Sequence, residues 1–147
     1  NIALACDVVV AKASASFIQA FSKIGLIPDS GGTYTLPRLI GMQRASALMM
    51  MGDKVSATDA QNMGMIYKVF ADDVYEAEVQ KIALQLAQMP TYGLALTKKA
   101  LNQTFNNTLE AQLELEDVLQ TMAGNSEDYK EGTSAFLEKR MPVFKGK

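Results

Sequence analysis

The chain has 147 residues, 48% of them hydrophobic and 20% charged, which is typical of a globular protein rather than a disordered or fibrous one. A formal net charge of −2 argues against a nucleic-acid partner. The chain has no histidine, which excludes Ser/His and Cys/His catalysis. The usual zinc ligand is also missing, so we expect no metal site. No apolar run approaches the roughly 18 residues that span a bilayer, so no membrane segment is expected, and a single cysteine fits a reducing, cytoplasmic setting.

The first half of the chain predicts short strands alternating with short helices. Runs rich in β-branched or alternating apolar residues predict strands over residues 7–11 (DVVVA), 16–20 (SFIQA) and 66–70 (IYKVF). Between the second and third strands, helices are expected over residues 30–40 and 43–51. This alternation predicts the α/β class.

Helix-end signals set several of these boundaries. Gly52 follows the last apolar residues of the second helix and is expected as the residue that ends it. Ser56, with Asp59 three residues later, forms a variant of the capping box. A third helix should therefore begin after Ser56 and end before Gly64.

The second half of the chain predicts helices only. Apolar residues at i, i+3, i+4 and i+7 predict an amphipathic helix that ends before Pro90: Val79, Ile82, Ala83 and Leu86. Further helices are expected over residues 92–104, 109–122 and 126–139. The chain should therefore combine an α/β first part with a helical second part.

The stretch LIPDSGGT (residues 26–33) contains an acidic residue, Asp29, directly before a predicted helix. On spacing alone, Asp29 or Ser30 is most simply a helix cap, because Asp and Ser readily accept the free N–H groups of a first turn. The alternative is a general base: the helix N-terminus would keep the carboxylate ionised while the neighbouring apolar residues exclude water. Both hypotheses stay open at this point.

The segment SAFLEKR near the C-terminus carries a second candidate. Phe136 and Lys139 are three residues apart, so on a helix they would share one face. They are either a packed aromatic beside a solvated lysine or a site for an anion and a flat or apolar group. The sequence alone does not decide between these two hypotheses.

Several motifs, in this order and spacing, resemble the enoyl-CoA hydratase/isomerase (crotonase) superfamily: ACDVVVAKASASF, GLIPDSGGTYTLPRLIG, GDKVSATDAQNMGMIYKVF and EGTSAFLEKRMPVFKGK. The resemblance covers essentially the whole chain. It implies the C-terminal part of a crotonase-type ββα spiral core over residues 1–71, followed by a helical trimerisation lobe over residues 72–147. Because the chain starts with Asn1 rather than Met, it is expected to be the C-terminal half of such a protein.

The resemblance also implies a chemistry. In this family two backbone N–H groups polarise an acyl-CoA thioester, and a carboxylate moves a proton on the resulting enolate; both N–H groups would lie upstream of Asn1. Members that add water use two glutamates, and the corresponding positions hold Asn1 and Phe21. Asp29 matches the aspartate of certain isomerases, although dienoyl-CoA isomerases pair that aspartate with a glutamate at the position of Phe21.

We therefore expect an acyl-CoA thioester isomerase with Asp29 as its single acid/base, similar to the ring-epoxide isomerases of phenylacetate breakdown. Phe21, Leu26 and Ile27 should line the acyl pocket, while Phe136 and Lys139 should contact the CoA of a neighbouring subunit. The expected partners are the acyl-CoA substrate and further copies in a homotrimer or dimer of trimers, with no cofactor beyond the CoA of the substrate. The alternatives are an enoyl-CoA hydratase or dienoyl-CoA isomerase, and a non-catalytic CoA-binding or assembly fragment.

Overall fold

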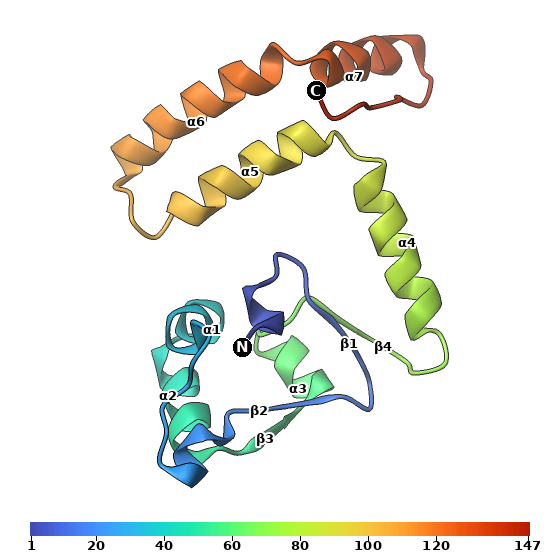
Figure 1. The fold of residues 1–147 in the computed structure, drawn as a ribbon. Helices are drawn as coiled ribbons and strands as arrows, with labels where there is room; N and C mark the ends of the chain where they lie inside the picture. The colour runs from blue at the N-terminus through green and yellow to red at the C-terminus, as the bar shows by residue number, and fades with distance from the viewer. The chain divides into compact units, whose positions relative to one another are not determined.

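The computed structural model describes residues 1–147 and divides into two compact units, Asn1–Gln80 and Lys81–Lys147 (Figure 1). The first unit is mixed α/β and the second is helical, so the predicted class is confirmed. The exact domain boundary expected after residue 71 stays a prediction. None of the helices is long and apolar enough to cross a membrane.

The first unit holds four short strands with helical segments between them. Its elements, in chain order, are η1 (Ala3–Ala5), β1 (Val10–Lys12), β2 (Ser16–Ile18), η2 (Ala20–Ile24), α1 (Gly32–Ile40), α2 (Met42–Met51), β3 (Lys54–Ser56), α3 (Ala57–Asn62) and β4 (Lys68–Phe70). β1 pairs in parallel with β4, and β2 pairs antiparallel with β3. The sequence patterns predicted β1, β2 and β4 as longer strands and missed β3.

The strands are shorter than predicted because their pairing is short. The β1–β4 register starts at Val10 opposite Lys68, and ahead of it only the Val9 carbonyl is bonded across, to the Tyr67 N–H at 2.9 Å. The second strand stops at Ile18 because the chain turns into the 3₁₀ helix η2 at Ala20. A β-branched run thus indicated the right segment, whereas the partner strand decided its length.

The core of the first unit is built where apolar faces of α1, α2 and α3 meet the strands. Leu36, at 0% exposure, and Ile40 are four residues apart on α1 and form its inner face. Ala57 and Ala60 are fully buried on α3, where their small side chains let the helix approach its neighbours closely. The rest of the cluster comprises Leu4, Ala11, Ala45, Val55, Met65 and Ile66.

Two predicted helix ends are confirmed. Ser56 Oγ accepts the Asp59 N–H at 3.0 Å and donates to the Asp59 carboxylate at 2.6 Å, which is the predicted capping arrangement. Gly52 ends α2 in the left-handed conformation, with φ 64°.

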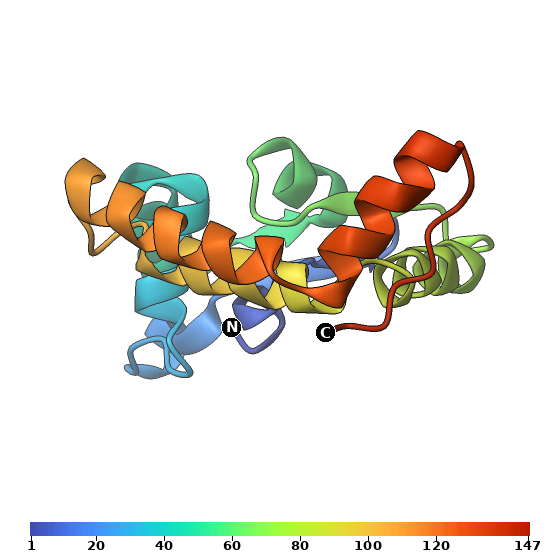
Figure 2. The same ribbon diagram turned by 90° about the horizontal axis from the view of Figure 1, so that it is seen from above.

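The second unit contains the helices that follow α4 (Tyr75–Ala87), whose residues lie on both sides of the unit boundary. They are α5 (Thr91–Gln103), α6 (Leu109–Gly124) and α7 (Glu127–Glu138). α5 and α6 run side by side in opposite directions, with Leu96 and Leu119 buried (Figure 2). After α7 the tail returns along that helix, and the Asp128 N–H donates to the Lys147 carbonyl at 3.0 Å.

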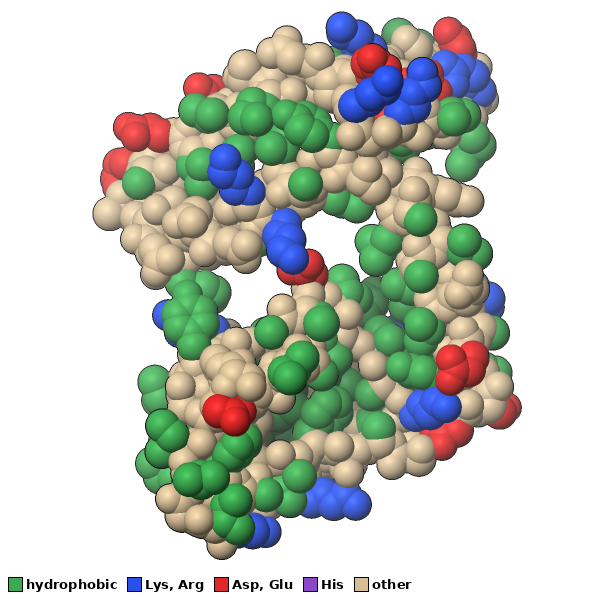
Figure 3. Space-filling view, viewed as in Figure 1, with side chains coloured by type: hydrophobic (Ala, Val, Ile, Leu, Met, Phe, Trp, Pro, Cys, Tyr) green, Lys and Arg blue, Asp and Glu red, His purple; other side chains and the backbone are tan.

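Large hydrophobic side chains remain on the surface of both units (Figure 3). Those at least 60% exposed include Ile24, Leu26 and Ile27 in the first unit and Leu101, Leu109, Phe136 and Leu137 in the second. Such surfaces are typical of faces that contact further protein or a ligand.

Candidate active site

The loop between η2 and α1 presents Asp29. Gly25, with φ 74°, ends η2, and the Leu26 N–H donates back to the Phe21 carbonyl at 3.0 Å. Ser30 and Gly31 then adopt positive φ values of 49° and 75°, and α1 starts at Gly32. Asp29 therefore lies on a tight turn just before the helix.

The prediction that Asp29 or Ser30 caps α1 with its side chain is wrong. The N-cap residue is Gly31, and no side chain accepts from the first turn. The two successive positive φ values turn the backbone so that carbonyl groups take over: Gly32 N–H donates to the Asp29 carbonyl at 2.8 Å, and Tyr34 N–H donates to the Gly31 carbonyl at 3.0 Å. The Asp29 carboxylate is thereby left out of the cap.

The Asp29 carboxylate is exposed and accepts a hydrogen bond from its neighbour. Ser30 Oγ donates to Asp29 Oδ1 at 3.0 Å. A carboxylate with one hydroxyl donor and open lone pairs can accept a proton and return it. The geometry is therefore compatible with acid/base chemistry at this position.

Two carboxamides connect the Asp29 turn to the rest of the first unit. Asn1 Nδ2 donates to the Asp29 carbonyl at 3.0 Å, and Gln19 Nε2 donates to Asn1 Oδ1 at 2.7 Å. The resemblance identified Asn1 only as a position where a glutamate is missing, and no sequence pattern pointed to Gln19. The only sequence signal for Gln19 is that it is a polar residue near the end of the apolar run SFIQA. Such residues are common, so this signal could not predict the contact with Asn1.

The residues expected to line the acyl pocket share the segment that carries Asp29. Phe21 lies on η2 and is half-buried, whereas Leu26 and Ile27 in the loop are 60% and 80% exposed. The chain thus brings Phe21, Leu26 and Ile27 into the same stretch as Asp29 but does not enclose them. The water-excluding surroundings expected for Asp29 are not formed by these residues alone.

Phe136 and Lys139 belong to the second unit. Phe136 is 82% exposed near the end of α7, but that helix ends at Glu138, and Lys139 is its C-cap with φ 55°. The prediction that both residues share one helix face is therefore wrong, because Lys139 has left-handed backbone geometry. The two remain local neighbours: the Lys139 N–H donates to the Phe136 carbonyl at 3.3 Å.

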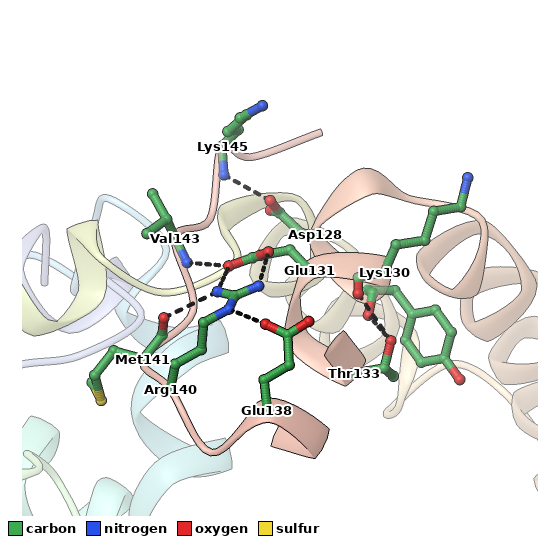
Figure 4. A network of polar contacts seen from close by, with 10 residues as sticks. Asp128, Lys130, Glu131, Thr133, Glu138, Arg140, Met141, Val143 and Lys145 are labelled. Atoms are coloured by element: carbon green, nitrogen blue, oxygen red, sulfur yellow. Dashed lines mark hydrogen bonds and ion pairs between the residues drawn. The ribbon is translucent and has the colours of Figure 1, made fainter. Parts of the chain in front are cut away.

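A polar network fixes the chain that follows Lys139 (Figure 4). Arg140 donates through Nη1 and Nη2 to both Glu131 oxygens and through Nε to Glu138, and the Val143 N–H donates to Glu131 Oε1 at 2.8 Å. The Arg140 hydrogen bonds, followed by that of Val143, lower the pKa of Glu131 from 4.5 to about 2. The hydrogen bonds to Glu131 and then to Glu138 raise the pKa of Arg140.

Asp128 holds the end of the same tail. Its side chain is buried, Oδ1 accepts the Lys145 N–H at 2.7 Å, and Oδ2 accepts the Gly146 N–H at 2.9 Å. Phe136 lines one edge of an apolar groove of about 540 Å³ between α7, the tail, the start of α5 and the end of α6. The tail around Phe136 and Lys139 is thus fixed by carboxylates of α7.

The structure contains no group of three or more His, Cys, Asp or Glu side chains arranged to hold a metal ion. The expectation that the protein needs no cofactor beyond substrate CoA stays a prediction.

The family model for enoyl-CoA hydratase/isomerase matches residues 1–147. The chain belongs to the enoyl-CoA hydratase/isomerase family. It is 50% identical over 147 residues to the 1,2-epoxyphenylacetyl-CoA isomerase of Escherichia coli (strain K12), covering 100% of this chain and 56% of that protein. It is 38% identical over 147 residues to the 2,3-dehydroadipyl-CoA hydratase of the same strain, covering 58% of that protein.

Solved structures show the fold of the enoyl-CoA hydratase/isomerase family over the same range. An enoyl-CoA hydratase from Bacillus anthracis superposes with a TM-score of 0.93 at 34% identity, covering 98% of this chain and 56% of that one. The chain therefore spans little more than half the length of the relatives that it matches, and the resemblance first seen in the motifs is confirmed at the level of the family and its crotonase fold.

Proposed function

We propose that the full-length protein is an acyl-CoA thioester isomerase in which Asp29 is the single proton-transfer group. The observation that carries this proposal is the state of Asp29: its carboxylate is exposed, is not used as a helix cap, and is bonded to one hydroxyl. The positions at which hydratases of the family are expected to carry glutamates hold Asn1 and Phe21, neither of which can exchange a proton.

In this mechanism Asp29 takes a proton from one carbon of the bound thioester and returns it to another. The electron pair left behind is held as an enolate, which the family's two backbone N–H donors would stabilise from outside this chain. Adding water would need a second group to activate the nucleophile, and the expected positions offer none. The substrates proposed are acyl-CoA esters with a ring epoxide or a movable double bond, as in the breakdown of phenylacetyl-CoA.

The decisive experiment replaces Asp29 by asparagine in the full-length protein. Asp29→Asn keeps the shape and the acceptor for Ser30 but removes proton transfer, so kcat should fall about 10²- to 10⁴-fold with little change in KM. Asp73→Asn is the matched control, because Asp73 is an exposed carboxylate of the same unit. Isomerase turnover that survives in Asp29→Asn would remove Asp29 from the mechanism.

A hydratase is the second candidate, because two of the proteins reported above are named as hydratases. The two activities differ in their product. The full-length protein incubated with an enoyl-CoA should form almost no 3-hydroxyacyl-CoA if Asp29 acts alone, whereas rapid hydration would favour the hydratase. Dienoyl-CoA isomerisation, a further alternative, can be assayed on the same samples with a dienoyl-CoA.

We also propose that Phe136 and Lys139 contact the CoA of a neighbouring subunit in a trimer or dimer of trimers. Their exposure and the fixed tail beside them support a preformed contact. Lys139→Ala should raise KM for a CoA thioester but not for the shorter pantetheine thioester, which lacks the nucleotide phosphates. Equal KM changes for the CoA and pantetheine thioesters, or a monomeric mass in sedimentation, would contradict this assignment. If the protein instead has a non-catalytic assembly role, sedimentation should show oligomers and the assay should show no turnover.

A further inference from the structure

The turn that carries Asp29 has an uncommon backbone. Two successive residues, Ser30 and Gly31, have positive φ, and only the second is a glycine. A residue with a side chain seldom adopts this conformation unless its surroundings enforce it, and such residues gather at functional sites. Something outside the turn must therefore hold it in place.

The side chain of Asn1 is the contact that holds it. The Asp29 carbonyl accepts two hydrogen bonds, one from Asn1 Nδ2 at 3.0 Å and one from the Gly32 N–H at 2.8 Å. Gly32 makes room for this contact, since a Cβ atom there would lie only 2.4–2.5 Å from the Asn1 amide atoms. The carboxamide is thus pressed against the start of α1 and joins residues 28 positions apart.

Gln19 in turn fixes Asn1. Its side chain is 8% exposed, and Nε2 donates to Asn1 Oδ1 at 2.7 Å, which leaves the Asn1 amide nitrogen facing Asp29. Gln19 Oε1 is buried with no partner, and both carboxamides line a cavity of about 60 Å³, large enough for a water molecule. The buried Gln19 side chain is therefore oriented by its hydrogen bond to Asn1.

We propose that Asn1 and Gln19 are positioning residues that aim the Asp29 carboxylate at the substrate, an inference that rests on the proposed function. The carboxylate itself is bonded to the Ser30 hydroxyl, so its direction is set through the backbone that Asn1 holds. The three residues form a chain from Gln19 through Asn1 to the Asp29 carbonyl. A proton-transfer group displaced by about 1 Å can lose about 10²-fold in rate, so a remote contact of this kind can control turnover.

The test uses Asn1→Ala and Gln19→Met in the full-length protein. Each should lower kcat about 10- to 100-fold while KM for the thioester stays within about twofold, because substrate binding does not depend on the aim of the carboxylate. The double variant should be no slower than Asn1→Ala alone, since Gln19 acts through Asn1. If Asn1→Ala yields little folded protein, the kcat of Gln19→Met tests the positioning role by itself.

The matched control is Gln61→Met. Gln61 is also a glutamine of the first unit, and its Oε1 accepts the Val69 N–H at 2.6 Å to hold β4, so its loss should lower the melting temperature but not kcat. A fall in kcat that tracks melting temperature across all variants, or kcat unchanged in both Asn1→Ala and Gln19→Met, would overturn the positioning role. Normal turnover in Asp29→Asn would instead overturn the proposed function itself, so the two failures are distinguishable.

Discussion

Replacing Asp128 by alanine should release the C-terminal tail from α7. Asp128 is 3% exposed, and its two oxygens accept the N–H groups of Lys145 and Gly146 at 2.7 and 2.9 Å. Hydrogen bonds to charged groups contribute about 1.5–3 kcal/mol each, so the pair contributes about 3–6 kcal/mol before relaxation. Once the tail detaches, the released amides can bond to water. The net loss of stabilising free energy should therefore lie near the lower value of about 3 kcal/mol.

The expected result is therefore a loss of about 3 kcal/mol in the free energy of tail opening. Since about 1.4 kcal/mol corresponds to a factor of ten, the amides of Lys145 and Gly146 should exchange with deuterium about 100-fold faster. Amide exchange followed by NMR in the full-length protein measures this directly. The melting temperature should change less, because opening the tail leaves the α5–α6 pair intact.

Two comparisons sharpen the measurement. Asp128→Asn keeps one acceptor oxygen but turns a donor NH2 group toward the other amide, so it should accelerate exchange most at the amide that loses its acceptor. Asp117→Ala, at an exposed position on α6, should leave both amides unchanged. Exchange at Lys145 and Gly146 that is the same in Asp128→Ala as in the parent protein would show that the two hydrogen bonds do not hold the tail.

The remaining predictions concern acid stability and the core. Because the folded-state pKa of Glu131 is lowered from 4.5 to about 2, its pairing stabilises the fold above pH 4.5 and is lost as the pH falls toward 2. The difference in unfolding free energy between the parent and Glu131→Gln should shrink over that interval in denaturant titrations, and a pH-independent difference would contradict the assignment. Leu36→Ala should lower the unfolding free energy by about 2–5 kcal/mol, because Leu36 is fully buried. Leu39→Ala, on the exposed face of α1, should lower it by less than about 1 kcal/mol. Equal losses in the two variants would show that Leu36 is not part of the core.

Local signals predicted the helices well. The Ser56 and Asp59 side chains and Gly52 act within one turn of their own helix, so a short window of sequence contains the whole interaction. The strands were harder, because β1 pairs with a strand 58 residues later and its length follows from that partner. A local sequence pattern does not include the partner strand, so it could not predict the length of β1.

In the candidate site, too, the sequence predicted residues that are close along the chain but not contacts between distant residues. Motif resemblance found Asp29, Phe21, Leu26 and Ile27 as one segment, and the structure keeps them together on η2 and the loop that follows. It did not find Gln19, whose role depends on a contact with Asn1 across 18 positions. Lys139 was assigned to a helix face because it lies three residues after Phe136, yet its own backbone is left-handed.

The question of whether Asp29 is a helix cap or a base depends on which atoms satisfy the first turn of α1. Carbonyl groups of Asp29 and Gly31 accept the N–H groups there, and the positive φ values of Ser30 and Gly31 are what bring those carbonyls into position. A carboxylate used as a cap would have its lone pairs occupied by backbone donors and would lose basicity. Because the backbone takes over the capping, the Asp29 carboxylate stays outside the helix cap, as the proposed acid/base role requires, and Asn1 Nδ2 bonds to the carbonyl of the same residue.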